Sequence, residues 1–220
     1  MSTIVSPPPA EPGLETFPSA GILGNLFRMK VDQYENLVES GVLDGEPIEL
    51  IDGLLVRKTG KKPPHVIACE ASRDELLPLL PRGWRLVLEA PVRIPDYDEP
   101  EPDQGIVRGT REDYEDRHPG PADIALLIEV SDTTLDRDRG EKRAAYARGN
   151  VSTYWIVNLV DRQLEIYTDP SATGYRRVRI LKPDEEVAVV LDGTEIGRIT
   201  VSDLLPRVAP GGAGGLANHP

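Results

Sequence analysis

The sequence is poor in cysteine, histidine and aromatic residues. Its 220 residues include one cysteine, three histidines and 5% aromatic residues. A single cysteine excludes an intramolecular disulfide framework and is typical of a reducing compartment, so we expect a cytoplasmic protein. One cysteine and three histidines also cannot supply the Cys/His spacing of a structural zinc site.

Long apolar runs and the motifs of several enzyme classes are missing too. No run approaches the roughly 18–20 apolar residues that a membrane span needs, and the N-terminus lacks the pattern of a secretory signal, so we expect no membrane association. The sequence has no Gly-x-Ser-x-Gly elbow and no glycine-rich loop of the Walker or dinucleotide-binding type. These absences disfavour a serine hydrolase and a classical nucleotide-binding enzyme.

Basic residues are outnumbered by acidic ones. Lys and Arg total 25 against 37 for Asp and Glu, which gives a formal net charge of −12. A polyanionic ligand such as a nucleic acid would have to bind against this net charge.

The composition predicts one folded domain with flexible ends. With 39% hydrophobic residues, the chain is long enough to bury a full core. We expect a flexible tail over residues 1–28, which contains three consecutive prolines, a domain over 29–206, and a glycine-rich flexible tail over 207–220. The apolar residues between 21 and 29 are expected to pack on the domain or on a partner.

Periodicity and turn residues predict an α/β fold. We expect helices over 31–40, 65–80 and 137–148, and a hairpin around Asp52-Gly53. A strand pair or one long strand is expected over 84–94, with further strands over 105–107, 124–128, 152–160, 164–168, 175–181 and 186–191. A strand–helix–strand crossover among them predicts a mixed β-sheet core flanked by helices.

The segment 122–150 is the most informative part of the sequence. The apolar run from Ile124 to Ile128 is typical of a strand buried on both faces, and Glu129 stands at its end. An ionised carboxylate in such a setting costs several kcal/mol unless a cation or hydrogen bonds compensate. The helix that follows carries Lys142 and Tyr146 four residues apart, on one face. Ser131 occupies the place where a simple Glu-x-Lys motif would have its lysine, so Lys142 is the candidate substitute.

These residues, taken in order, resemble a known family. Glu49-Leu50-Ile51-Asp52-Gly53, His65, Pro102-Asp103, Glu129-Val130-Ser131, Lys142, Tyr146 and Tyr154-Trp155-Ile156-Val157 are similar in order and spacing to the Uma family of restriction endonucleases, within the PD-(D/E)xK nuclease superfamily. The resemblance spans roughly residues 31–206. It implies a restriction-endonuclease-like fold and a metal-dependent endonuclease.

The resemblance also implies a role for each residue. Asp103 and Glu129 are expected to hold Mg²⁺ or Mn²⁺, with the carbonyl of Val130 as a further ligand. Glu49 is expected to assist the metal or its water, and Lys142 to position the attacking water. Tyr146 and His65 are expected to support these catalytic residues.

For most of these residues a structural role is the alternative to the catalytic one. Asp103 can be a solvated loop acid, Glu49 an edge-strand glutamate, and Glu129 a strand-end acid paired with Arg139 or Arg143. Lys142 can be a solvated helix lysine paired with Asp138. Tyr146 is more often a core residue, and His65 at a helix start more often has a structural role.

The sequence therefore leaves two classes of function open. The first is an endonuclease that hydrolyses phosphodiester bonds in DNA, expected to be a homodimer because cutting two strands takes two sites. The alternative is a catalytically silent nuclease-fold interaction module, motivated by the net charge of −12. In it the arginines at 137, 139, 143 and 148 would form a basic edge. A less favoured variant of the first class is a nuclease directed at RNA or at a nucleic-acid structure, because the sequence has no motif that recognises bases.

Overall fold

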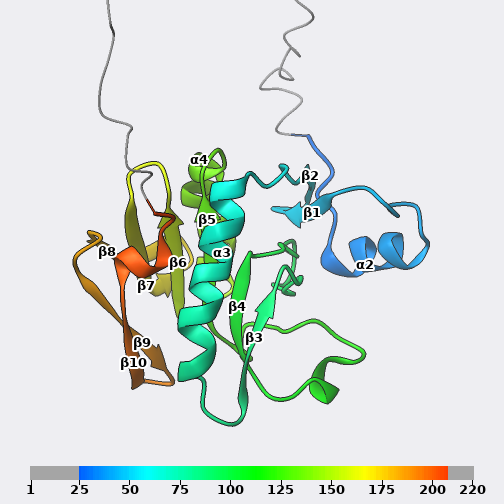
Figure 1. Cartoon of the computed structure of the whole chain (residues 1–220). Coiled ribbons are helices and arrows are strands. Elements are labelled where there is room, and N and C mark those ends of the chain that lie inside the picture. Colours follow the sequence, from blue (N-terminus) through cyan, green and yellow to red (C-terminus); the bar gives the residue numbers. More distant parts are fainter. Residues whose placement is uncertain (1–24, 208–220) are drawn as a thin grey trace, which may run out of the picture.

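The computed structural model describes residues 25–207, and a six-stranded sheet is its centre (Figure 1). The strand order is β3-β4-β5-β6-β7-β8. All neighbours are antiparallel except β5 and β6, so the sheet is mixed. The strands are β3 (Trp84–Leu88), β4 (Gln104–Arg108), β5 (Ile124–Ser131), β6 (Thr153–Asn158), β7 (Gln163–Ser171) and β8 (Gly174–Leu181). The predicted α/β fold with a mixed sheet flanked by helices is confirmed. The tails predicted over 1–28 and 207–220 lie almost entirely outside the described residues, as does part of the apolar stretch 21–29.

The parallel pair is joined by a helical crossover. Between β5 and β6 the chain forms α4 (Leu135–Arg137), a π-helical turn (Asp138–Lys142) and α5 (Arg143–Arg148), one after the other without a break. A parallel connection needs such a crossover, because a tight turn only joins antiparallel strands. The π turn lets the helix place Lys142 and Tyr146 toward the sheet, and such turns are common at functional sites.

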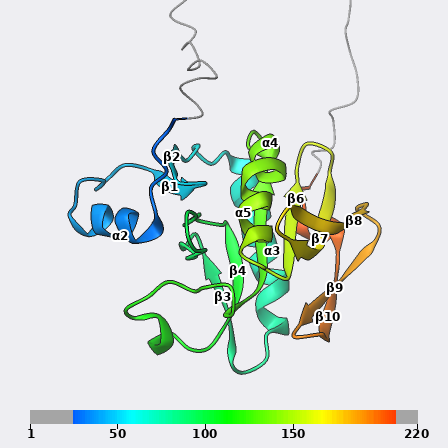
Figure 2. The same cartoon turned by 180° about the vertical axis from the view of Figure 1, so that it is seen from behind.

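Helices cover both faces of the sheet. On one face, α3 (Pro63–Leu76) packs on Ile128, Val130 and Trp155 together with the hairpin of β9 (Glu186–Leu191) and β10 (Thr194–Thr200). On the other face, seen in Figure 2, Tyr146 of α5 packs on apolar side chains of β4, β5 and β6. Every residue of β5 is buried, as expected for a strand with cover on both sides.

A smaller unit attaches beside the sheet. It consists of α2 (Val31–Glu39) and the hairpin of β1 (Ile48–Ile51) and β2 (Leu54–Arg57). Asp52 and Gly53 both have positive φ at the predicted turn, which suits a two-residue hairpin. Backbone hydrogen bonds between Leu50 and Glu99 tie β1 to the segment that leads into β4.

Two predicted elements end earlier than expected. The helix predicted over 65–80 stops at Leu76 and continues as a 3₁₀ turn over Leu77–Leu79, because Pro78 has no N–H to donate to the next α-helical hydrogen bond. The strand predicted over 84–94 is only β3, which ends at Leu88. Glu89 has positive φ there, and four prolines follow before β4 at positions 91, 95, 100 and 102.

Among the described residues no helix is long and apolar enough to cross a bilayer.

A buried carboxylate on β7 joins the sheet to the crossover helix. Glu165 accepts hydrogen bonds from Arg139, from Asn158 Nδ2 at 2.7 Å, from Gln163 Nε2 at 3.3 Å and from the Tyr167 hydroxyl at 2.7 Å. Burial alone would raise the pKa of Glu165, but these donors lower it to about 2. The ionised form is therefore the one that the folded state stabilises.

Replacing Glu165 by glutamine is expected to lower the free energy of unfolding at pH 7 by roughly 2–3 kcal/mol. The folded pKa of about 2 lies below the ordinary value of 4.5. The stabilisation is thus complete above pH 4.5 and is lost as the pH falls toward 2, so the two proteins should converge on acidification. Urea unfolding at pH 7, 5 and 3 measures this. Asp161→Asn is the matched control, because Asp161 also accepts from Arg139 but is half exposed. An equal loss in both variants would contradict the expectation.

Candidate active site

The alternation of β5 sends Glu129 to the face covered by the crossover helix. Its neighbours Ile128 and Val130 point into the opposite layer with α3. Glu129 is only 3% exposed, and its Oε1 accepts two hydrogen bonds, from Lys142 Nζ at 2.8 Å and from the Tyr146 hydroxyl at 2.7 Å. Arg139 pairs with Glu165 instead. The alternative in which Glu129 pairs with Arg139 or Arg143 is therefore wrong.

Lys142 is a buried ammonium group held by three oxygen atoms. Besides Glu129, its Nζ contacts Glu49 Oε2 at 3.2 Å and the backbone carbonyl of Glu101 at 3.3 Å. These acceptors match the three protons of an ammonium group. Lys142 is 4% exposed, and Asp138 instead accepts hydrogen bonds from Ser131 and Thr134. The alternative of a solvated helix lysine paired with Asp138 is wrong.

Glu49 comes from the β1 hairpin and points inward. It is 2% exposed, and its Oε2 accepts the backbone N–H of Glu101 at 3.0 Å as well as contacting Lys142. Its other oxygen, Oε1, is buried and has no hydrogen-bond partner among the described residues. The alternative of an exposed edge-strand glutamate is excluded by this burial.

Asp103 lies directly before β4 and is bound through both oxygens. Oδ2 accepts the backbone N–H of Val130 at 2.9 Å and lies 3.1 Å from His65 Nε2, while Oδ1 lies 3.0 Å from Lys61 Nζ. Burial would raise the pKa of Asp103, but His65, the Val130 N–H and Lys61 lower it to about 2. Asp103 is thus an ionised, largely buried carboxylate and not a solvated loop acid.

The site is organised around excess negative charge. Burial raises the pKa of Glu129 to about 8, although Lys142 opposes the shift. Burial would lower the pKa of Lys142, but the carboxylates of Glu129, Glu49 and Asp138 raise it above its usual value. The ammonium charge of Lys142 therefore offsets the desolvation of the buried acids only in part, and an added cation would lower the remaining cost.

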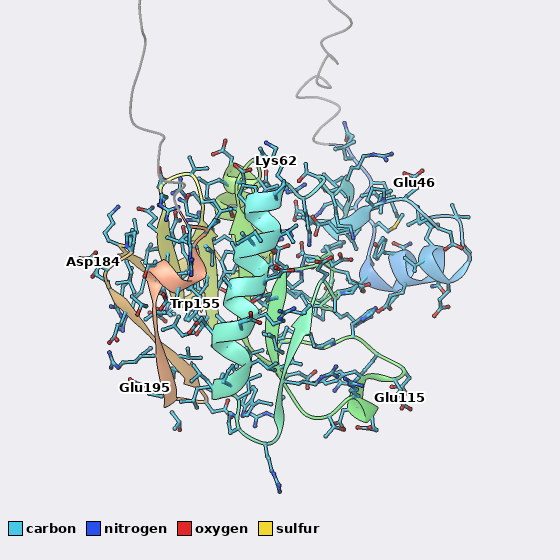
Figure 3. The ribbon with its side chains drawn as sticks, viewed as in Figure 1. Glu46, Lys62, Glu115, Trp155, Asp184 and Glu195 are labelled. Carbon is cyan, nitrogen blue, oxygen red and sulfur yellow. The ribbon has the colours of Figure 1, made fainter. Side chains whose placement is uncertain are left out.

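A cavity of about 60 Å³ opens between these side chains. A water needs roughly 10–15 Å³ of such volume, so the cavity accommodates a few waters or a partly hydrated ion. Lys62, seen at the N-terminal end of α3 in Figure 3, lies at its rim. Glu49, Asp103, Glu129 and Lys142 all line this cavity. The other charged or polar residues of the lining include Lys58, Lys61, Lys62, His65, Glu101, Asp132, Thr134 and Arg137.

The chemistry of the donor set suits a hard divalent cation, although among the described residues the three ligand atoms that lie within 4.8 Å of one another belong to His65, Cys69 and Asp103. Glu49, Asp103 and Glu129 all line the cavity and offer carboxylate oxygens, which Mg²⁺ prefers. The buried, unpartnered Oε1 of Glu49 carries an uncompensated cost that a cation would remove. At Asp103 the ammonium group of Lys61 occupies Oδ1, and Lys61 is exposed enough to move away.

Five of the predicted residues line one cavity, whereas Val130 and Tyr146 do not: the five are Glu49, His65, Asp103, Glu129 and Lys142. Tyr146 and His65 each contact one of the acids, Glu129 and Asp103 respectively. Val130 is present through its N–H, while the predicted ligand role of its carbonyl stays a prediction. Sequence reasoning missed Lys61. The only signal for it was a run of basic residues from the end of β2 to the start of α3 in an otherwise acidic chain, at positions 57, 58, 61 and 62.

Fold and site together define the class as a restriction-endonuclease-like α/β protein, and comparison with known proteins agrees. The family model Uma2, described as "Putative restriction endonuclease", matches residues 31–202. The chain belongs to this family.

A solved structure is similar as well. It is titled a putative nuclease belonging to DUF820, from Anabaena variabilis ATCC 29413, and it aligns with a TM-score of 0.56 over 80% of this chain and 97% of that chain. The sequence identity is 17%, so this likeness bears on the fold alone. A comparison with curated proteins gave no match.

Removing only one partner of the buried pair should destabilise the protein strongly. We expect Lys142→Met to lower the free energy of unfolding by about 3–5 kcal/mol, because Glu49 and Glu129 lose their shared cation. In the double variant Lys142→Met/Glu129→Gln, the free energy of unfolding should fall by less than the sum of the decreases in the two single variants. The reason is that fewer buried charges stay uncompensated. Urea unfolding at constant pH, with metal chelated, provides the measurement.

Lys62→Met is the matched control, because Lys62 lies at the rim of the same cavity with its side chain 60% exposed. This substitution should lower the free energy of unfolding by no more than about 0.5 kcal/mol. Strict additivity of Lys142→Met and Glu129→Gln would show that the two groups do not act as a pair.

Proposed function

We propose that this protein is a metal-dependent endonuclease that hydrolyses phosphodiester bonds in DNA. The observation that carries the proposal is the convergence of three buried carboxylates and one buried lysine on a single cavity in a chain of the restriction endonuclease family. A structural core rarely gathers so many ionisable groups, because each one costs desolvation energy. Strongly perturbed groups in a cleft are typical of catalytic sites.

Asp103 and Glu129 would hold Mg²⁺ or Mn²⁺, with the Val130 carbonyl as a further ligand and Glu49 in support. When bound, such an ion supplies a more acidic water and stabilises charge on the phosphoryl oxygens. Among the described residues Glu129 Oε2 accepts no hydrogen bond, whereas Oε1 is fixed by Lys142 and Tyr146. Tyr146 thereby orients the carboxylate with one oxygen free.

Lys142 would position the attacking water. Its three protons are directed at protein oxygens, and the contact with the Glu101 carbonyl, at 3.3 Å, is the longest of the three. Exchanging this acceptor for a water would place the water beside Glu129 while the ammonium charge stays close to the phosphate. His65 would hold Asp103 in place through Nε2.

DNA is the proposed substrate despite the net charge of −12. Basic side chains line the cavity: Lys58, Lys61 and Lys62 come from the segment between β2 and α3, and Arg137 comes from α4. Together with Lys142, these basic groups nearly balance the six carboxylates of the lining, and they would contact phosphate oxygens once a bound divalent cation makes the net charge of the cavity positive. A duplex cut on both strands requires two sites, so we propose a homodimer in a cytoplasmic setting.

The alternative is a catalytically silent interaction module on the same fold. Its predicted basic edge of four arginines is weakened by their partners: Arg139 binds Glu165, Arg148 binds Asp98, and Arg137 donates to the Arg57 carbonyl. Arg143 lies over the Tyr167 ring. These contacts favour the endonuclease.

Purified protein should nick supercoiled plasmid in the presence of Mg²⁺ or Mn²⁺ and not in the presence of EDTA. Asp103→Asn and Glu129→Gln should lower the nicking rate at least about 100-fold, because each removes a charged ligand. Asp132→Asn, a carboxylate at the cavity rim whose only ion pair is at 3.8 Å, is the matched control and should cut like the unmodified protein. Agarose gels over time give the rates, with single-stranded DNA and RNA as parallel substrates. Cleavage that survives in both ligand variants would refute the site.

Metal binding separates the two functions without any cleavage assay. We expect calorimetric titration with Mn²⁺ to detect a site that Asp103→Asn weakens at least about tenfold. Asp132→Asn again serves as the control for a change in net charge. An interaction module need bind no metal through Asp103, so unchanged Mn²⁺ binding in Asp103→Asn would favour the silent module.

A further inference from the structure

The only cysteine of the chain lies beside the candidate active site, on the far side of Asp103. Cys69 and His65 are four residues apart on α3 and share one helix face. The Cys69 Sγ lies 3.5 Å from His65 Nδ1, and His65 Nε2 lies 3.1 Å from Asp103 Oδ2. A sulfur, an imidazole and a carboxylate therefore meet where α3 passes the start of β4.

The spacing of these three groups suits a single small cation. One ligand atom from each side chain lies within 4.8 Å of the ligand atoms of the other two. Ligands around tetrahedral zinc, with bonds of about 2.0–2.3 Å, stand about 3.3–3.7 Å apart. The three ligand atoms thus have to approach one another by up to about 1 Å. Because Cys69 and Asp103 lie at opposite nitrogens of the His65 ring, this approach includes a rotation of the imidazole.

A second cavity gives access to this place. It has a volume of about 200 Å³ and is lined by Cys69, Asp103, Lys61 and Glu89, among others. Glu49, Glu129 and Lys142 do not line it, and neither does His65; these four residues line the oxygen-rich cavity, which Asp103 also lines. An ion can therefore reach the sulfur without passing through the candidate active site.

A cysteine nucleophile is a poor explanation for the same arrangement. Burial raises the pKa of the Cys69 thiol, with Asp103 adding to the shift. A thiolate nucleophile needs the opposite environment, with a lowered pKa.

We propose that Cys69, His65 and Asp103 form a binding site for a thiophilic divalent cation of the Zn²⁺ class, next to the oxygen-ligand site and sharing Asp103 with it. The thiol gives up its proton to solvent as the sulfur–metal bond forms, and the imidazole binds in its neutral form. Waters complete the coordination, as at other zinc sites with three protein ligands.

The shared ligand links this site to the candidate active site. A Zn²⁺ ion bound to Cys69 and His65 draws the Asp103 carboxylate toward itself and away from Lys61 and the oxygen-rich cavity. Zn²⁺ then inhibits Mg²⁺-dependent cleavage. This consequence, unlike the binding itself, rests on the proposed function.

Titration of the metal-free full-length protein with Co²⁺ tests the binding. Only a cysteine ligand gives the near-ultraviolet thiolate-to-cobalt charge-transfer band, and the chain has one cysteine. We expect the band to appear, to be displaced by Zn²⁺ and not by Mg²⁺, and to be absent in Cys69→Ser. His65→Ala should weaken Co²⁺ binding at least about tenfold. His118→Ala, which alters the other described histidine, should bind like the unmodified protein. Thermal unfolding of each variant verifies that it folds.

Two results would overturn the proposal. One is the absence of the band at a large molar excess of Co²⁺, and the other is a band of unchanged affinity in a folded His65→Ala protein. In a cleavage assay, Cys69→Ser should keep Mg²⁺-dependent nicking and lose inhibition by Zn²⁺. If the protein proves to have no nuclease activity, the Co²⁺ titration still decides whether the site exists, so the two proposals fail separately.

Discussion

The structure depends most on one buried interaction, the ammonium group of Lys142 between the carboxylates of Glu129 and Glu49. It joins three parts of the chain that are distant in sequence: the β1 hairpin, the central strand β5 and the crossover helix. Each group alone would carry a large desolvation cost, and together they compensate only in part, because one oxygen of Glu49 keeps no partner. A hydrophobic core at this position would be easier to stabilise. That the chain retains ionisable groups here argues that they serve chemistry.

The sheet explains how such a cluster forms without disturbing the core. Side chains alternate along β5, so Ile128 and Val130 fill the layer with α3 while Glu129 enters the opposite layer. The register of β4 on β5 then sets Asp103 where its carboxylate meets the N–H of Val130, one residue beyond Glu129. Two acids from adjacent strands are thus placed by backbone pairing alone. The crossover helix only has to supply Lys142 and Tyr146, four residues apart on one face.

Much of this was predictable, and the limits have physical causes. The apolar run before Glu129 predicts a buried strand with a carboxylate that needs a partner, and helical spacing puts Lys142 and Tyr146 on one face. Strand periodicity cannot say which cation meets Glu129, because Lys142, Arg139 and Arg143 all lie on the next helix. The rotation of that helix about its axis decides which of the three faces Glu129. In the structure Arg139 pairs with Glu165 instead. Lys61 and Cys69 were not predicted as part of the site because their positions near Asp103 arise from the docking of α3 and its preceding segment, which no local pattern encodes. The catalytic roles of the gathered residues stay predictions.

Asp103 lies between two sets of side chains that suit different kinds of metal ion. Toward β1 and the crossover helix its neighbours are oxygen donors, which prefer small hard cations; toward α3 they are a sulfur and an imidazole, which prefer softer ones. Lys61 on one oxygen and His65 on the other hold the carboxylate between these surroundings. A shift of its side chain toward either partner therefore costs little, whereas loss of both would leave a buried charge uncompensated. An acid held in this way can exchange Lys61 or His65 for a bound ion without rearranging the sheet, since the Val130 N–H keeps its anchor in the strand pairing.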